Sequence, residues 1–358
     1  MYEDYYKLKD KPFQLSPDAR FYFSSKGHNR AMAYLRYGLG QGEGFIVITG
    51  GIGTGKTMLL RNLFNELDQD TIIAVELLST QLKSDDLIIA VAEAFGLSAK
   101  NKSKSEILAM LEDYLHDKRQ QGYRLLLVVD EAQNLPEETL EELRMLSNYH
   151  DEEGALLQSF LLGQVQLKHK LQSAGMEQFR QRIIAGYHLQ PLERDETEQY
   201  VTYRLTQVGW KDDPLIGQDA FDRIHTATAG VPRRINRLCE RLMLFGALEQ
   251  VHEIEGKHVD SVAAEISSEL GISKEEELQL AAEPPAVSTD SSAASAAPVA
   301  AEMPKAVTPV VDAAASAVTI ELLNRVNQLE NEVSELKRSM ARNRNLLKAA
   351  LFDEDDKF

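Results

Sequence analysis

The sequence contains only one cysteine, Cys239, among 358 residues. One cysteine cannot form a disulfide within the chain, and its place in the apolar helical pattern RLCERLML favours a small buried side chain over a reactive thiol. The eight histidines are scattered, and none stands at metal-ligand spacing beside cysteine or acidic partners. The sequence therefore predicts neither an internal disulfide nor a histidine metal centre.

Long apolar runs and an excess of basic residues are also lacking. No uncharged apolar segment reaches the roughly 18 residues of a membrane-crossing helix, and the opening MYEDYYKLKD has none of the features of a secretory signal. The formal net charge is -17. There is no strong nucleic-acid signal, because a phosphate backbone is bound mainly by clustered Lys and Arg. These absences favour a cytoplasmic protein without a transmembrane segment.

What is present is a glycine-rich stretch, GGIGTGKT, between an apolar run at residues 45–48 and a helical pattern. It matches G-x-x-x-x-G-K-[ST], whose small residues let backbone N–H groups surround phosphates at a helix N-terminus. The stretch predicts a P-loop that binds ATP with Mg²⁺, through Gly50, Gly51, Ile52, Gly53, Thr54, Gly55, Lys56, Thr57 and Met58. We expect Lys56 to reach the β and γ phosphates and Thr57 to ligate Mg²⁺.

Polar residues follow two later apolar runs. Asp130 and Glu131 come directly after residues 125–129, and the carboxyl ends of parallel strands are where open sheets bind ligands. Asp130 is expected to hold Mg²⁺ through water, and Glu131 to act as general base for an attacking water. Gln164 follows residues 156–162, where its amide could orient that water or sense the γ phosphate; a helix N-terminal residue is the alternative.

Three arginines are candidates for contact with a nucleotide. Arg180 and Arg182 stand just before an expected strand, where a guanidinium could stabilise transition-state charge on a neighbouring subunit's nucleotide. Arg233 lies at the start of a helix in GVPRR and could reach back to a phosphate from there. Taken alone, each is better explained as a solvated surface arginine.

Short β-rich runs alternate with amphipathic helical patterns up to Pro191, which predicts βαβ units and a parallel sheet. Strands are expected at 45–49, 71–77, 125–129, 156–162 and 183–189, with helices at 28–39, 58–67, 84–95, 105–121 and 136–149. After Pro191 only helical patterns remain, near 193–208, 217–227, 232–248 and 257–268. We therefore expect an α/β P-loop NTPase fold with three layers and a helical lid domain.

The composition divides the chain further. We expect an N-terminal arm and helix at 1–44, the α/β domain at 45–191 and the lid at 192–272, then a disordered Ala/Pro/Ser linker at 273–318, an amphipathic helix or short coiled coil at 319–350 and an acidic tail at 351–358. The many aromatics of the first 24 residues predict an extended arm pinned to the surface by its rings. That arm either flanks a nucleotide base or only packs.

Taken in order, GGIGTGKT, LLLVVDEAQ, the Gln164 position, FRQRI and GVPRRINRL resemble an AAA+ ATPase. KPFQLSPDARFYF, GHNRAMAYLRYGLGQGEGFIVITG and VVDEAQNLPEETLEELRMLSN resemble the ExeA/GspA-type secretion ATPases, with the nearest similarity to the ATPase of exosortase A and PEP-CTERM systems. The resemblance implies that Lys56 and Thr57 are the Walker A pair, Asp130 and Glu131 the Walker B pair, Gln164 sensor 1, Arg182 or Arg180 the arginine finger, and Arg233 sensor 2.

The same resemblance implies a function. MgATP hydrolysis would drive or regulate assembly of an envelope exopolysaccharide or protein export system, in a homo-oligomer that uses its arginine finger between subunits. A protein partner of that system would bind the C-terminal helix and could bring the chain to the inner-membrane face. The sequence departs from the family at Gly51, Ile52 and Met58, and it shows neither the transmembrane helix nor the peptidoglycan-binding part of secretion members. A DNA-linked AAA+ ATPase of the transposition or origin-recognition type and a weakly hydrolysing nucleotide-switched scaffold remain as alternatives.

Overall fold

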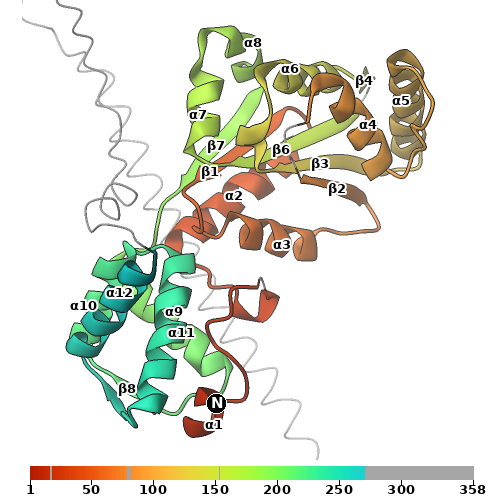
Figure 1. Ribbon diagram of the computed structural model, residues 1–358. Coiled ribbons are helices and arrows are strands. Elements are labelled where there is room, and N and C mark those ends of the chain that lie inside the picture. The colour runs from red at the N-terminus through yellow and green to blue at the C-terminus, as the bar shows by residue number, and fades with distance from the viewer. Residues whose placement is uncertain (17, 79–81, 153, 271–358) are drawn as a thin grey trace, which may run out of the picture. The chain divides into compact units, whose positions relative to one another are not determined.

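The computed structural model of the chain describes residues 1–16, 18–78, 82–152 and 154–270 (Figure 1). The linker, terminal helix and acidic tail expected at 273–358 lie outside these residues. The described part contains an α/β portion built on a parallel sheet and a helical portion, the lid, that follows it along the chain.

A five-stranded parallel sheet forms the centre of the α/β portion, in the order β2-β3-β6-β1-β7. Its strands are β1 (Phe45–Gly50), β2 (Ile72–Leu78), β3 (Arg124–Asp130), β6 (Leu157–Gly163) and β7 (Ile183–Leu189). All the predicted strands are therefore present. Because β1 lies between β6 and β7, the chain that leaves its carboxyl end is flanked by the ends of both neighbours.

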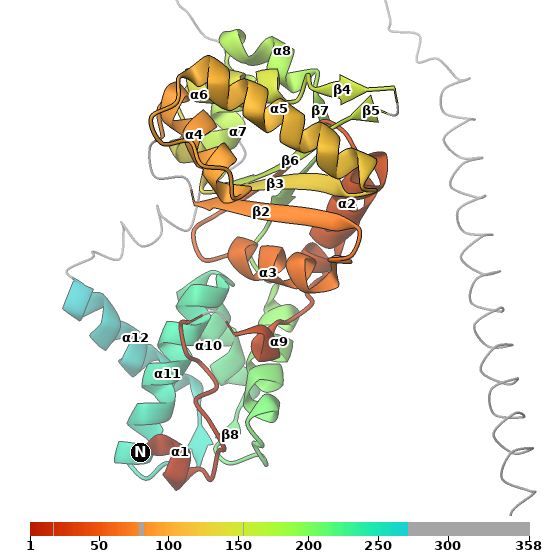
Figure 2. The same cartoon turned by 90° about the vertical axis from the view of Figure 1, so that its right-hand side faces the viewer.

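Helices cover both faces of this sheet, because alternate strand residues point to opposite sides. Ile46 and Ile48 of β1 pack toward α2 (Lys26–Gln41) and α3 (Lys56–Glu66), which lie together on one face (Figures 1 and 2). Phe45 and Val47 belong to the cluster on the other face. That face is covered by α4 (Ser84–Ala94), α5 (Lys104–Gln120), α6 (Glu137–Leu146), α7 (Val165–Gln172) and α8 (Glu177–Arg180). The three-layer arrangement is confirmed.

Several short elements were not predicted, because each has too few residues to show a repeating pattern of apolar side chains. They are α1 (Tyr2–Tyr5), the 3-10 turns η1 (Ala19–Phe21), η2 (Ala132–Asn134) and η3 (Ala174–Met176), and the hairpin of β4 (His150–Asp151) and β5 (Gly154–Ala155). The helices α7 and α8 were also missed. Of these elements, η2 bears on the candidate site, because it immediately follows Glu131.

The lid contains the four predicted helices, α9 (Arg194–Gln207), α10 (Gln218–Thr228), α11 (Pro232–Leu248) and α12 (Gly256–Leu270). The prediction that strands stop after Pro191 is wrong. β8 (Leu215–Ile216) and β9 (Glu253–Ile254) pair in parallel between the helices. Strands this short show no alternation of apolar and polar residues, so the sequence pattern could not reveal them.

The N-terminal arm is packed into the lid. Tyr2, Tyr6, Phe13 and Phe21 are buried in one hydrophobic cluster with residues of α9 to α12. A backbone hydrogen bond also joins the arm to the lid, because the Lys9 N–H donates to the Val208 carbonyl at 2.9 Å. These four rings therefore pack into the hydrophobic core of the lid, which is the packing alternative for the arm.

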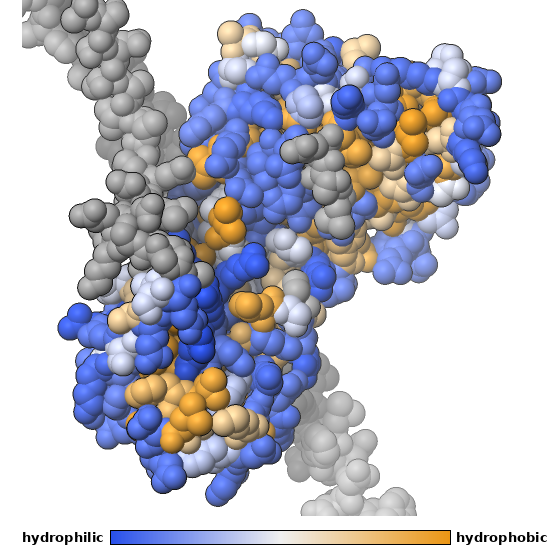
Figure 3. Space-filling view, in the orientation of Figure 1, coloured by the Kyte–Doolittle hydropathy of each residue, from blue (hydrophilic) through white to orange (hydrophobic). Residues whose placement is uncertain are grey.

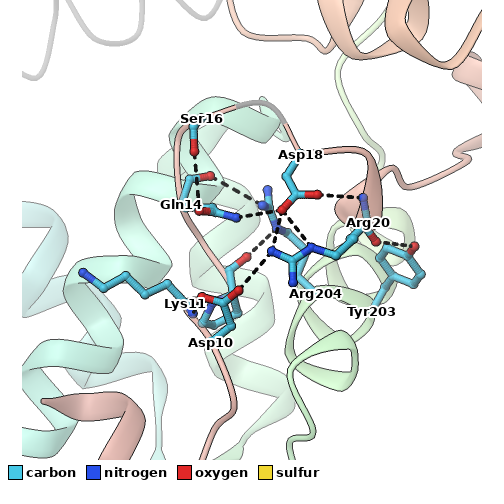
Figure 4. Close-up of polar contacts among 9 residues, drawn as sticks. Asp10, Lys11, Gln14, Ser16, Asp18, Arg20, Tyr203 and Arg204 are labelled. Carbon is cyan, nitrogen blue, oxygen red and sulfur yellow. Dashed lines mark hydrogen bonds and ion pairs between the residues drawn. The ribbon is translucent and has the colours of Figure 1, made fainter. Parts of the chain in front are cut away.

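Arg204 of α9 fastens this arm (Figure 4). The residue is 5% exposed, and its guanidinium donates to the Pro12 carbonyl at 2.6 Å and to the Tyr200 hydroxyl at 2.7 Å. It also lies over the Phe21 ring at 4.7 Å. A buried cation bound to backbone oxygens of the arm makes the arm an integral part of the lid core.

The face of the molecule in Figure 3 is largely hydrophilic, with smaller hydrophobic patches. Most large apolar side chains of the described residues are gathered in the clusters around the sheet and within the lid. In the same part of the chain, no helix combines the length and the apolar character that crossing a bilayer requires.

Candidate functional site

The glycine-rich stretch at 50–57 joins the end of β1 to the start of α3, as the P-loop prediction requires. Gly53 and Gly55 have φ of 80° and 103°, a left-handed conformation that glycine adopts without steric cost. Gly55 is also the N-cap of α3 and provides no side-chain cap, so the first N–H groups of the helix can serve an anion. The loop therefore has the backbone geometry of a phosphate site.

Lys56 lies within this loop. The residue is 6% exposed, and its Nζ donates to the carbonyls of Gly50 at 3.0 Å and Gly51 at 2.9 Å. Burial lowers the pKa of the ammonium, while the nearby carboxylates of Glu131 and Asp130 raise it. The two acids thus favour the charged form in a place where desolvation opposes it.

Thr57 and Asp130 come from different elements and meet beside the loop. The Thr57 hydroxyl donates to Asp130 Oδ2 at 3.2 Å. Burial raises the pKa of the Asp130 carboxyl, and the Glu131 N–H, which donates to Oδ1 at 2.8 Å, lowers it. A hydroxyl and a carboxylate are hard oxygen ligands of the kind that Mg²⁺ prefers. Among the described residues, no group of three or more His, Cys, Asp or Glu could hold a metal ion. Proteins usually bind Mg²⁺ through one or two side chains together with substrate phosphates, and the Thr57–Asp130 pair fits that pattern.

Glu131 follows the last residue of β3 in a left-handed conformation, with φ of 54°, and is the N-cap of η2. Its carboxylate oxygen Oε2 accepts a hydrogen bond from Gln164 Nε2 at 3.1 Å and another from Gln133 Nε2. Gln133 in turn accepts the Gln164 N–H on its Oε1 at 2.9 Å. The Gln133 and Gln164 amides thus hold the Glu131 carboxylate at the carboxyl end of β3, and Gln133 also bonds the backbone that joins β6 to α7.

Of the two alternatives for Gln164, the structure shows the helix N-terminal position, and the role toward water or the γ phosphate stays a prediction. Gln164 is the N-cap of α7, and its amide also reaches Glu131. Gln133 was not predicted from the sequence as a site residue. Its position two residues after Glu131 is the only signal in the chain, and that spacing gains meaning only once η2 turns the side chain back.

The predicted arginine pair lies at the amino ends of the strands, opposite the carboxyl ends where the P-loop lies. Ile183, which follows Arg182, pairs with Phe45 at the start of β1, whereas the P-loop follows its end, about 20 Å away along the strand. Arg180 donates to the carbonyls of Leu171 at 2.9 Å and Ser173 at 2.7 Å. The structure therefore does not bring these arginines to the P-loop of their own chain.

Arg182 donates to the Ser147 carbonyl at 3.3 Å and to the Asn148 side chain. It also lines an open surface hollow of about 670 Å³, which it shares with Arg144, Glu177, Gln178 and Gln181. Its guanidinium thus borders solvent-accessible space, whereas that of Arg180 is committed to the corner between α7 and α8.

Arg233 is brought to the P-loop by the lid. It is exposed at the start of α11, and its N–H donates to the Gly53 carbonyl at 3.2 Å. Thr54 of the predicted nucleotide set is buried, and its hydroxyl donates to the Gly51 carbonyl at 2.9 Å. Ile52 is 64% exposed at the tip of the loop, and Met58 is half-buried in the first turn of α3.

Comparison with known proteins points to one class. Residues 39–171 match the family model of the AAA domain. General secretion pathway protein A of Aeromonas hydrophila is 35% identical over 268 residues, which cover 75% of this chain. The chain spans about half the length of that relative, 49%.

Two solved structures are similar in fold. The ORC2 protein of Aeropyrum pernix, in ADPNP and ADP complexes, has a TM-score of 0.54 at 16% identity, and the match covers 72% of each chain. Cdc6p of Pyrobaculum aerophilum has a TM-score of 0.54 at 19% identity, over 72% of this chain and 71% of its own. At these identities the likeness concerns the fold alone, which is that of a parallel-sheet P-loop NTPase. The chain therefore carries an AAA domain at residues 39–171, and over 75% of its length it is similar to general secretion pathway protein A.

Proposed function

We propose that the chain binds MgATP at its P-loop and hydrolyses it with a water molecule activated by Glu131. The observation that supports this most directly is the contact between elements at the carboxyl edge of the sheet. Glu131 follows Asp130, which is bonded to Thr57 of the P-loop helix, while two amides orient the Glu131 carboxylate. A base, a metal-binding pair and a phosphate loop at one edge suit hydrolysis of a phosphoanhydride.

Each residue then has one task. Lys56 balances charge on the β and γ phosphates, and Thr57 and Asp130 would hold Mg²⁺. When bound, Mg²⁺ would neutralise charge that develops on the phosphate oxygens. Glu131 accepts a proton from the attacking water, and Gln164 orients that water. Arg233, at the start of α11, adds positive charge from the lid.

We also propose that Arg182 acts on the site of a neighbouring copy. Its distance along the sheet argues against action on its own P-loop, and the hollow that it lines leaves room for an approaching surface. Arg180 suits the role less, because its guanidinium already holds two backbone carbonyls. Catalysis would then require a homo-oligomer.

The proposed cellular role follows from the relative. We propose that ATP turnover drives or regulates assembly of an envelope export system, for protein or for exopolysaccharide. The name of the general secretion pathway relative supports a role in secretion. A protein partner would bind residues 319–350 and place the chain at the inner-membrane face. Pull-down with the full chain and with a variant lacking 319–350 tests this part separately.

Phosphate release under steady-state conditions tests the chemistry. We expect Glu131→Gln to lower kcat by about 100-fold or more while an ATP analogue still binds, because only the base is lost. We expect Lys56→Ala to weaken binding as well, and Glu249→Gln, on an exposed lid position, to behave as wild type. An unaltered rate in either of the first two variants would refute the assigned roles.

A further inference from the structure

His28 is the one buried histidine among the described residues, at 5% exposed. It lies in the first turn of α2, and the N-cap Ser25 receives its N–H at 3.2 Å. The ring is directed at the P-loop. A β-carbon placed on Gly55 would lie 2.6 Å from His28 Nε2, and the ring hydrogen-bonds the backbone of Thr54.

The ring is neutral at physiological pH. Burial lowers the pKa of His28 to about 4, although Glu196 and the bond to the Thr54 backbone act in the opposite direction. In a neutral imidazole one nitrogen accepts and the other donates. The Ser25 hydroxyl, 2.7 Å from Nδ1, can donate to that nitrogen. Nε2, which faces Gly55, then carries the ring N–H, with the Thr54 backbone as its partner. His28 therefore acts on the loop by a directed hydrogen bond and adds no positive charge for a phosphate.

That bond fixes a peptide plane of the loop. The carbonyl of Thr54 and the N–H of Gly55 belong to one planar trans peptide and point in opposite directions. When the Thr54 carbonyl points toward the His28 ring, the Gly55 N–H points away from the ring. P-loops bind phosphates through N–H groups that point into the loop. A ring beneath the loop can thus set the direction of a phosphate donor that it does not touch.

The same turn of α2 is tied to the lid. The Lys26 N–H donates to Glu196 Oε1 at 2.8 Å, and the Glu193 N–H donates to the other oxygen at 3.2 Å. Glu196 is itself buried in the first turn of α9. His28 therefore connects the P-loop with the point where α2 meets the lid.

We propose that His28 is a positioning residue of the P-loop, which holds the Thr54–Gly55 peptide in its phosphate-binding orientation and joins the loop to the lid through the turn that Glu196 caps. The role deepens the proposed function, and it rests on nucleotide binding at this loop. It does not depend on the identity of the base that hydrolyses ATP.

The test compares three variants of the full chain, His28→Ala, His28→Asn and His28→Gln, by titration with a fluorescent ATP analogue and Mg²⁺. The glutamine amide can place a donor near the position of Nε2, whereas the asparagine amide reaches only the position of Nδ1. We expect Kd to rise about tenfold for Ala and Asn, and to stay within about twofold of wild type for Gln. His258→Ala, which removes a half-buried histidine of the lid, should leave Kd unchanged.

Thermal unfolding shows whether each variant is folded. Wild-type Kd values in all three variants would overturn the proposal, and so would equal losses for Gln and Asn in folded proteins. If His28→Ala does not fold, the comparison of Gln with Asn decides. Because the titration measures binding, it remains decisive even if wild type proves not to hydrolyse ATP. Conversely, if wild type hydrolyses ATP and the three variants keep the wild-type Kd, only the role of His28 is refuted and the proposed function stands.

Discussion

At the scale of single residues, the orientation of Glu131 depends on two neutral amides. Replacing Gln133 by Met removes both its donor to Glu131 and its acceptor for the Gln164 N–H, with little change of volume. We expect kcat for ATP to fall about tenfold or more with KM little changed, because the base is misdirected while the phosphate loop is intact. Steady-state kinetics measure this. A higher KM at unchanged kcat would instead place Gln133 in nucleotide binding.

His28 makes the stability of the chain depend on pH. Its folded pKa of about 4 lies below the unfolded value of 6.5, so the unfolded chain binds the additional proton. The stabilisation is complete above pH 6.5 and is lost as pH falls toward 4. Between pH 7.5 and pH 5 we expect this group to lower the free energy of unfolding by about 1–2 kcal/mol.

Urea unfolding of wild type and His28→Gln at both pH values isolates that contribution, because glutamine does not titrate. Glu196 is the charged neighbour that faces the ring, and it is present in both proteins. An equal loss of stability in the two proteins would show that His28 is not the group responsible.

At the scale of elements, the start of α11 rests on the P-loop. A β-carbon on Gly53 would lie 2.6 Å from Arg233 Cβ, and the φ of Gly53 is 80°. We expect Gly53→Ala to push the helix from the loop and to weaken nucleotide binding about tenfold or more. Gly96→Ala is the matched control, since its φ is 82° but nothing lies within 4 Å of the added carbon. Equal Kd values for the two variants would exclude a binding role for the contact.

The arm and the lid form one hydrophobic unit through Arg204. In Arg204→Met, the Pro12 carbonyl and the Tyr200 hydroxyl lose a charged donor in a buried place. We expect the free energy of unfolding to fall by about 2–4 kcal/mol. Arg241→Met removes an exposed pair with Glu269, which should cost at most about 1 kcal/mol. Chemical denaturation of both variants makes the comparison, and similar losses would show that the arm adds little.

These elements also show what the sequence could predict. The five strands were predictable because runs such as LLLVV are buried on both faces, which their composition reveals. The P-loop was predictable because its residue types are fixed by its chemistry. Gln133 and His28 were not predictable. Gln133 reaches Glu131 and Gln164 because η2 turns its side chain back, and His28 reaches Gly55 because the start of α2 lies beside the P-loop. The burial of the arm in the lid likewise depends on pairings about 200 residues apart, as the 192-residue separation of Pro12 and Arg204 shows.

At the scale of the whole molecule, the position of Arg182 predicts that activity depends on assembly. Arg182→Ala should retain its own base, and Glu131→Gln should retain its arginine, so each is inactive alone. In an equal mixture we expect phosphate release to recover to about one quarter of the wild-type rate, since one interface in four joins an intact base to an intact arginine. Recovery should increase with total protein concentration. A mixture as inactive as its components would argue against action between subunits.

The packing of the arm has a consequence for how the protein is made. The arm leaves the ribosome before the lid, because its partner Arg204 lies 192 residues beyond Pro12. At roughly 5–20 residues per second, the arm waits about 10–40 s for α9 to be synthesised. During that interval Tyr2, Tyr6, Phe13 and Phe21 have no lid to cover them. Nascent chains stalled before α9 should therefore present an aromatic segment to chaperones, and chains released after α12 should not.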